Sequence, residues 1–486
     1  MHLSIPERER SYRKKIDSFA LFFYFHPILL INKILLYFRL TMRKVYGIIL
    51  LAQKLNTKEN NMNNIVIKNL LKGKNYLLAR VAIVLTAIVL LLTLVGPSVV
   101  LAIAKQPATK VHEYSDSFYT TYEDVRANLD RRVESLRANG IEVYQSEYAV
   151  NAADDLYIDN IYLPASGEKT NLIILTTGVH GMEGYIGSVM LDVFFEEIYP
   201  TLNTETTGIL VVANINPYGM KNYRRYNENN VDLNRNFIED WESFDLSSNK
   251  EYPKVVNFLQ PKGKMGNALW HEVGFYLSLA KEAIFTGADT ISDALLTGQY
   301  EYPTGVYYGG NGDEISTTYL KGVFADCLDG QYKNLIHIDI HSGYGPRYNM
   351  VIFNSVQDMT TEAEAVEMFG YDYIIAQDSE EFYVTYGDTT DYFYRLARSK
   401  GSEKDLYSTC FEFGTIGDSF IDSILSLKYT VDENRQHWFP TKNKITAEVV
   451  RQNYMELFYP TEMEWRVKTI ADFKDATFGV LGAKLK

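Results

Sequence analysis

A histidine and a glutamate stand three residues apart in the glycine-rich stretch TTGVHGMEGY, residues 176–185. Imidazole nitrogens and carboxylate oxygens are ligands of Zn²⁺. An H-x-x-E pair is common by chance, but His180 and Glu183 follow the apolar run 171–177 and precede an apolar, helix-like segment. A catalytic zinc takes three protein ligands and keeps one position open for water. The pair therefore predicts a third ligand at the end of another strand.

The segment IHIDIHSGYGP, residues 336–346, offers two candidates for this third ligand. His337 and His341 lie four apart, so they share one face of a strand. His341 stands at the strand end, beside Ser342 and Gly343, where a side chain can reach a cleft. His337 lies deeper and is expected to be a core histidine. We therefore expect His341 to complete the ligand set.

A second polar cluster, NPYGMKNYRRYNENNVDLNRNF, occupies residues 216–237. It begins with a turn, N-P-Y-G, and supplies Arg224, Arg225 and Arg235 together with several asparagines. Any one of these arginines fits a solvated polar loop. Arginines with neighbouring amides also bind carboxylates and polarise carbonyl groups.

Apolar strands alternate with helices from Lys105 onward, without a repeat or a low-complexity tract. Continuous apolar strands separated by helices predict an α/β sheet covered on both faces. Ligands of such sheets gather beyond the carboxyl ends of the strands, where residues 176–185 and His341 are expected. The expected helices are 120–139 and 185–198, and the expected strands are 141–150, 156–163, 171–177, 208–214, 334–340 and 410–413.

Charge is unevenly distributed along the chain of 486 residues, whose net charge is −13. Residues 1–104 hold 15 Lys and Arg against 4 Asp and Glu, a net charge of +11, which leaves −24 for residues 105–486. An acidic body argues against a nucleic-acid partner, which requires a basic face. The basic N-terminal part indicates targeting instead.

An apolar run of 24 residues without a charge, 81–104, is long enough to span a bilayer. Four basic residues precede it between 62 and 80. We expect 62–104 to be a signal peptide or a membrane anchor, either of which places the acidic body, 105–486, outside the cytoplasm. Residues 1–61 are expected to be a leader upstream of the natural start at Met62, with a second membrane segment as the alternative.

The two cysteines, Cys327 and Cys410, could form a disulfide in an exported protein. Cys410 lies inside an apolar, strand-like run. We therefore expect both to be free, buried thiols.

Several motifs in order, H-G-M-E, N-P-Y-G, R-x-N-E-x-N-V-D-L-N-R-N-F, H-S-G and F-E-F-G-T, resemble the zinc carboxypeptidase family of the carboxypeptidase A type. Carboxypeptidase A itself holds zinc with two histidines and a glutamate. The stretch GQYEYPTGVYYGG, 298–310, resembles a bacterial branch of that family usually labelled as a domain of unknown function. The resemblance extends from about Tyr114 to the C-terminus. It implies a mixed, mostly parallel sheet with helices on both faces, and one Zn²⁺ per chain.

The resemblance also implies the metal ligands and the catalytic residues. His180, Glu183 and His341 would bind zinc. Asp232 would orient the imidazole of His180. Glu412 would act as the general base.

Four further positions match residues that contact substrate. Arg225 would polarise the scissile carbonyl, and Asn234 with Arg235 would bind the terminal carboxylate. Tyr383 matches a mobile tyrosine that closes over substrate, with Tyr386 as the alternative position. Thr390 would then lie in the specificity pocket.

Three functions remain open at the level of sequence. The first is a zinc carboxypeptidase that removes C-terminal residues from peptides. The second is a zinc amidohydrolase or deacylase acting on N-acyl amino acids or cell-wall amides. The third is a metal-free binding module. About 100 residues separate Phe237 from His341, an insertion that is expected to shape the cleft and to admit a non-peptide amide.

Overall fold

The computed structural model describes residues 114–379 and 385–486. The N-terminal expectations for 1–61 and 62–104, and the position of Tyr383, lie outside the described residues. Among the described helices, none is both long enough and apolar enough to cross a membrane.

A single sheet of eight strands forms the centre of the fold, in the order β1-β2-β4-β3-β5-β8-β6-β7. Parallel pairing joins β4 to β3, β3 to β5, β5 to β8 and β6 to β7, whereas the other neighbours are antiparallel. The strands are β1 Tyr144–Asn151, β2 Leu156–Leu163, β3 Asn171–Thr177, β4 Thr207–Ala213, β5 Asn334–Ser342, β6 Met350–Asn354, β7 Ile374–Ile375 and β8 Asp405–Phe413. The predicted mixed, mostly parallel α/β sheet is therefore confirmed.

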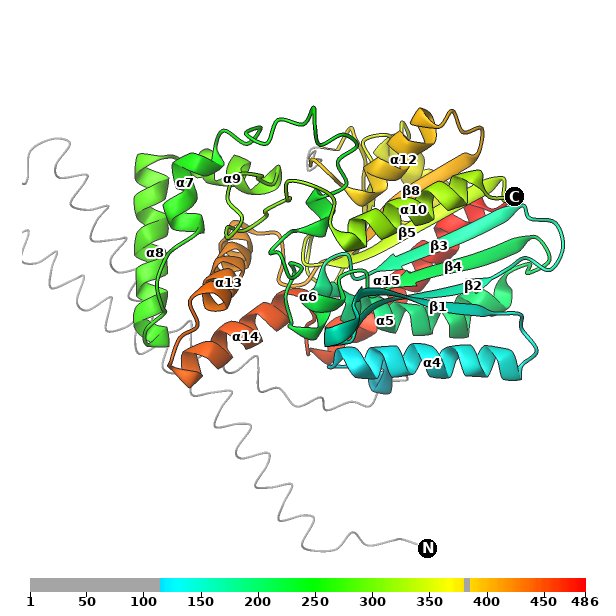
Figure 1. Ribbon diagram of the computed structural model, residues 1–486, viewed down its shortest axis with the longest axis horizontal. Coiled ribbons are helices and arrows are strands. Elements are labelled where there is room, and N and C mark those ends of the chain that lie inside the picture. The colour runs from blue at the N-terminus through cyan, green and yellow to red at the C-terminus, as the bar shows by residue number, and fades with distance from the viewer. Residues whose placement is uncertain (1–113, 380–384) are drawn as a thin grey trace, which may run out of the picture. The chain divides into compact units, whose positions relative to one another are not determined.

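Helices cover both faces of the sheet (Figure 1). On one face α4, Tyr122–Ala138, α5, Gly184–Val193, and α15, Met463–Lys484, pack in the largest apolar core. On the other face α10, Ile315–Asp329, and α12, Thr389–Ser399, pack in a second core. Burial from both sides explains why every residue of β3 and β5 is buried.

The predicted helices lie close to their expected positions. The helix expected at 120–139 begins after Thr121, whose side chain accepts a hydrogen bond from the backbone N–H of Asp124, and it ends before Asn139. The helix expected at 185–198 begins at Gly184, and its final turn, Phe194–Ile198, is a π-helix.

The long segment between Phe237 and His341 is mainly helical before it enters β5. It contains α7, Tyr252–Leu259, α8, Ala268–Phe285, and α9, Ala288–Leu296, in addition to α10. The first three helices pack with α13, Phe420–Trp438, in a third apolar core. The remaining α-helices of the described part of the chain are α6 Pro217–Lys221, α11 Glu362–Phe369 and α14 Lys444–Phe458.

Candidate metal centre and cleft

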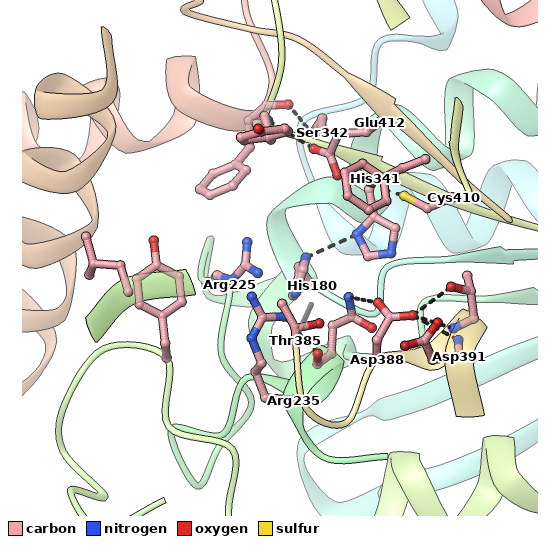
Figure 2. A pocket seen from close by; sticks show the side chains of 18 of the residues that line it. His180, Arg225, Arg235, His341, Ser342, Thr385, Asp388, Asp391, Cys410 and Glu412 are labelled. Atoms are coloured by element: carbon pink, nitrogen blue, oxygen red, sulfur yellow. Dashed lines mark hydrogen bonds between the residues drawn. The ribbon is translucent and has the colours of Figure 1, made fainter. Parts of the chain in front are cut away.

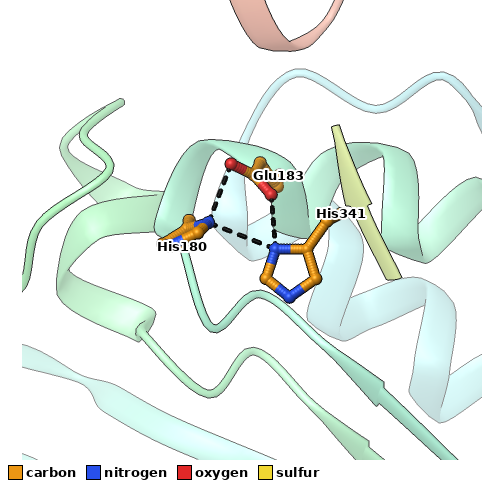
Figure 3. A group of neighbouring side chains, drawn as sticks. All are labelled: His180, Glu183 and His341. Atoms are coloured by element: carbon orange, nitrogen blue, oxygen red, sulfur yellow. Dashed lines mark hydrogen bonds and ion pairs between the residues drawn. The ribbon is translucent and has the colours of Figure 1, made fainter. Parts of the chain in front are cut away.

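Three buried side chains, His180, Glu183 and His341, converge at the carboxyl ends of β3 and β5 (Figure 3). Nδ1 of His180 lies 2.9 Å from one carboxylate oxygen of Glu183, and Nδ1 of His341 lies 2.9 Å from the other. The two Nδ1 atoms are 3.2 Å apart. The structure thus brings together the three residues that the sequence predicts as zinc ligands.

The sheet and one close backbone contact position these ligands. β3 and β5 run parallel with Thr177 opposite Ile340, so the turn after β3 meets His341 at the edge of the sheet. The short 3-10 helix Gly181–Glu183 then places the glutamate beside the histidine. A Cβ at Gly181 would lie 2.1 Å from the backbone of Gly219 in α6, which explains why this turn requires glycine.

A buried carboxylate orients each imidazole. Nε2 of His180 lies 3.0 Å from Asp232, and Nε2 of His341 lies 2.9 Å from Asp339. When Nε2–H donates to a carboxylate, the lone pair of the ring is on Nδ1. Both lone pairs therefore face the carboxylate of Glu183, an arrangement that requires a positive charge among them.

The contact between Asp232 and His180 was expected from the sequence, whereas the contact between Asp339 and His341 was not. Asp339 stands two residues before His341 on β5, so both side chains lie on the same face of the strand. That spacing is visible in the sequence and could have suggested the contact.

The donor set fits a zinc ion. Four tetrahedral ligands about 2.1 Å from zinc would lie about 3.4 Å from one another, close to the separations of 2.9 to 3.2 Å found here. The backbone N–H of Ser342 donates to Glu183 over 3.0 Å and fixes its carboxylate. Burial opposes the charge on Glu183, but the two imidazoles hold the pKa of Glu183 well below its ordinary value.

The carboxylates of Asp339 and Glu183 favour a positive charge at His341. Burial alone would lower the pKa of His341, but Asp339 and Glu183 raise it well above its ordinary value. The site therefore accepts positive charge, and a divalent metal would supply that charge without a proton.

Glu412 lies directly opposite His341 in the register between β5 and β8. Its Oε1 accepts a 3.0 Å hydrogen bond from the backbone N–H of Tyr344. Burial and the nearby carboxylate of Glu183 raise the pKa of Glu412 to about 7. A carboxylate with this pKa is suited to take up and release a proton near neutral pH.

Arg225 lies beside the three candidate metal ligands and lines the same cleft (Figure 2). Its Nε donates to Asp232 over 2.8 Å, and Nη1 lies 3.5 Å from Glu183. Its guanidinium also stacks over the ring of Tyr307, 5.6 Å from the ring centre. These contacts hold the guanidinium at the edge of the predicted zinc site.

Asn234 and Arg235 both line the cleft, but their surroundings differ. The Asn234 amide donates to Asp388 over 3.0 Å and accepts from the backbone N–H and the hydroxyl of Thr389, so it holds the start of α12. Arg235 donates from Nη1 to the carbonyl of Asn234 over 2.9 Å. Within the described residues Arg235 forms no ion pair, and its Nε has no hydrogen-bond partner.

The cleft is a cavity of about 200 Å³ that extends from His180 and His341 towards α12. Thr390, for which the resemblance implies a place in the specificity pocket, lines this cavity, and its hydroxyl donates to Asp388 over 2.6 Å. Asp391 also lines it; burial and Asp388 raise the pKa of Asp391 to about 6. Tyr386, the alternative to Tyr383, is exposed, and its ring contacts Phe244 at a centroid distance of 5.6 Å.

The insertion contributes to the wall of the cleft. Leu295, at the end of α9, and Tyr307 both line the cavity, together with Ser426 and Thr430 of α13. Trp270 of α8 is 73% exposed and does not line it.

His337 is a core histidine, as expected. Its ring nitrogens lie 2.8 Å from the hydroxyls of Thr176 and Ser408, and it is fully buried. Burial lowers the pKa of His337 to about 4, so it is neutral at physiological pH. Both cysteines are free, as expected: Cys327 is buried and Cys410 is partly buried.

Comparison with known families identifies the chain. The profile of the family described as "Protein of unknown function (DUF2817)" matches residues 118–472. The chain belongs to this family. The resemblance to a branch labelled as a domain of unknown function is thereby confirmed. A search of curated proteins found no match.

Solved structures similar to this DUF2817 chain include zinc carboxypeptidase relatives. Bovine thrombin-activatable fibrinolysis inhibitor, in complex with a tick carboxypeptidase inhibitor, is 14% identical over 76% of this chain and 100% of its own, with a TM-score of 0.40. Carboxypeptidase A from Helicoverpa armigera is 14% identical over 73% and 78%, with a TM-score of 0.38. Succinylglutamate desuccinylase from Chromobacterium violaceum is 12% identical over 63% and 74%, with a TM-score of 0.29.

Proposed function

We propose that this protein is a zinc-dependent hydrolase that cleaves the amide bond of a C-terminal residue. The observation that carries the proposal is the convergence of His180, Glu183 and His341, with Glu412 opposite His341 on the neighbouring strand. An acid with a pKa near 7 beside a three-ligand site is the arrangement required to activate water.

Zinc held by these residues would polarise the scissile carbonyl and lower the pKa of the attacking water to about 7. Glu412 takes a proton from that water as the oxygen of the water bonds to the carbonyl carbon. Glu412 then gives the proton to the leaving amine nitrogen as the C–N bond breaks, and its carboxylate is restored. The hydrogen bond from the backbone of Tyr344 holds the carboxylate in place for both transfers.

The two arginines that line the cleft, Arg225 and Arg235, have different proposed roles. Arg225, held by Asp232 beside the metal ligands, stabilises the negative charge that develops on the carbonyl oxygen. Arg235 lines the same cleft without an ion-pair partner among the described residues, and it binds the terminal carboxylate of the substrate. Asn234 supports this end of the site through α12, because its amide is already bonded to Asp388 and Thr389.

A second candidate is a zinc amidohydrolase or deacylase that acts on N-acyl amino acids. The observation that favours it is the wall formed by Leu295 and Tyr307 of the insertion, which encloses a small cavity. A short acyl group suits such a cavity better than a long peptide does. Both candidates use the same metal ligands and the same base.

Hydrolysis of a library of N-blocked dipeptides, acyl amino acids and longer peptides tests the proposal. We expect release of the C-terminal residue, abolished by a chelator and restored by zinc. Hydrolysis of acyl amino acids alone would favour the second candidate. No chelator-sensitive hydrolysis of any substrate, with zinc bound at about one ion per chain, would refute both.

A further inference from the structure

Two loops meet on the surface of the third apolar core. The loop 260–267 joins α7 to α8, and the loop 439–443 joins α13 to α14. Nε of Arg435 donates to the carbonyl of Gly263 over 2.8 Å, and the hydroxyl of Thr446 donates to the carbonyl of Gly266 over 2.9 Å. Figure 1 shows the N-terminal end of α8 beside the junction of α13 and α14.

These loops carry a local positive charge on an acidic protein. Four lysines are exposed there: Lys262, Lys264 and Lys442 in the loops, and Lys444 at the start of α14. Within the described residues none of the four forms an ion pair. No Asp or Glu occurs in 260–267 or in 438–446, although residues 105–486 carry a net charge of −24.

Large apolar side chains are exposed on the same loops and at the adjoining helix ends. Trp270 is 73% exposed, Ile445 is 73% exposed and Trp438 is 39% exposed. We call these three residues and the four lysines the basic–aromatic patch. Tryptophan beside lysine is the composition found where proteins meet the headgroup region of a bilayer, because the indole ring is apolar and its N–H is polar.

We propose that the basic–aromatic patch docks on an anionic lipid bilayer. The lysines contact lipid phosphates, and Trp270, Trp438 and Ile445 enter the interface between headgroups and acyl chains. The acidic remainder of the body is repelled by such a surface, so the patch also determines which side of the protein faces the lipid.

The predicted apolar run 81–104 supports lipid as the partner. It ends ten residues before Tyr114, where the described structure begins. Ten extended residues span at most about 35 Å. If the run lies in a bilayer, the folded body is held close to that bilayer, and the patch needs little additional affinity to dock.

Hydrogen exchange of the full chain reconstituted in vesicles tests the proposal. One set of vesicles contains phosphatidylcholine alone, and the other contains about 30% phosphatidylglycerol, a level that attracts juxtamembrane lysines. We expect amide exchange in 262–270 and 438–445 to slow at least about fivefold on the anionic vesicles only, because each lysine near an anionic surface contributes about that factor in affinity. About 0.5 M NaCl should remove the effect.

Two variants with the same change of charge provide the comparison. Replacement of Lys262, Lys264, Lys442 and Lys444 by Gln should abolish the slowing. The control variant replaces four exposed lysines elsewhere, Lys250, Lys333, Lys400 and Lys486, and should retain it. Far-UV circular dichroism confirms that both variants are folded.

Three outcomes would overturn the proposal. The first is equal protection on the two kinds of vesicle. The second is protection that persists in the patch variant. The third is protection without vesicles that grows with protein concentration, which would identify a second copy of the chain as the partner.

Discussion

Replacement of Asp339 by Asn should weaken zinc binding without removing a ligand. Asp339 is buried, with one carboxylate oxygen 2.9 Å from Nε2 of His341 and the other 2.6 Å from the hydroxyl of Thr176. An Asn side chain has nearly the same shape, but it has one oxygen and one N–H₂ group. It can therefore present an oxygen to His341 or to Thr176, but not to both. If its amide N–H₂ faces His341, the imidazole proton must move to Nδ1, the atom proposed to bind the metal. If its oxygen faces His341, the negative charge that makes the imidazole more basic is lost.

Either orientation raises the dissociation constant for zinc. Loss of a carboxylate that orients a metal-bound histidine costs about 10- to 100-fold in affinity, or about 1.4 to 2.7 kcal/mol. Competition with a chromophoric chelator measures this constant directly. Asp372→Asn is the matched control, since Asp372 is exposed, and its affinity for zinc should equal that of the wild type.

Asp339 is a better choice for this test than Asp232. Asp232 also binds Arg225 and accepts a hydrogen bond from the backbone of Asn234, so its replacement would disturb the fold of the loop as well. Wild-type zinc affinity in a folded Asp339→Asn variant would refute the assignment of His341 Nδ1 as a metal ligand.

Three further predictions concern activity and stability. Glu412→Gln should lower kcat by about 10²- to 10⁴-fold and leave zinc binding intact; unchanged kcat would contradict its role as the base. Arg235→Ala should lower kcat/KM by about 10- to 100-fold for substrates with a free terminal carboxylate, while substrates with an amidated terminus should be unaffected; equal losses for both would exclude carboxylate binding. In the metal-free protein the pKa of Glu412 is raised from 4.5 to about 7, so its ionisation opposes folding as the pH rises through this range. Melting curves in chelator should therefore show Glu412→Gln gaining stability over the wild type between about pH 4.5 and 8, and a constant difference would contradict the raised pKa.

The sequence was most informative where one physical pattern dominated. The strands β3 and β4 are largely continuous apolar runs, so their burial between helices could be anticipated. In β5 apolar residues alternate with polar ones, yet the whole strand is buried. His180, Glu183 and His341 could be placed together because they stand at the ends of predicted strands. β6 and β7 were not predicted, because both are short; β7 contains only Ile374–Ile375.

Contacts between distant loops could not be read from the sequence. Asn234 was expected to bind substrate, but its amide is hydrogen-bonded to residues 388 and 389, more than 150 positions away. No local pattern indicates that α12 begins beside this asparagine. The insertion was expected to shape the cleft, but its Trp270, on α8, is exposed to solvent and does not line the cavity.

The pairing of His341 with Glu412 across β5 and β8 separates reactivity from selectivity. Hydrogen bonds of the sheet hold the proposed metal ligand His341 and the proposed base Glu412 in register, whereas α9, α12 and Tyr307 contribute to the walls of the cavity. Those outer segments could therefore be exchanged to change which amide substrate binds, while the arrangement of His341 and Glu412 stays the same. A shift of one residue in either strand, by contrast, would turn one of the two side chains to the opposite face and abolish the chemistry at once.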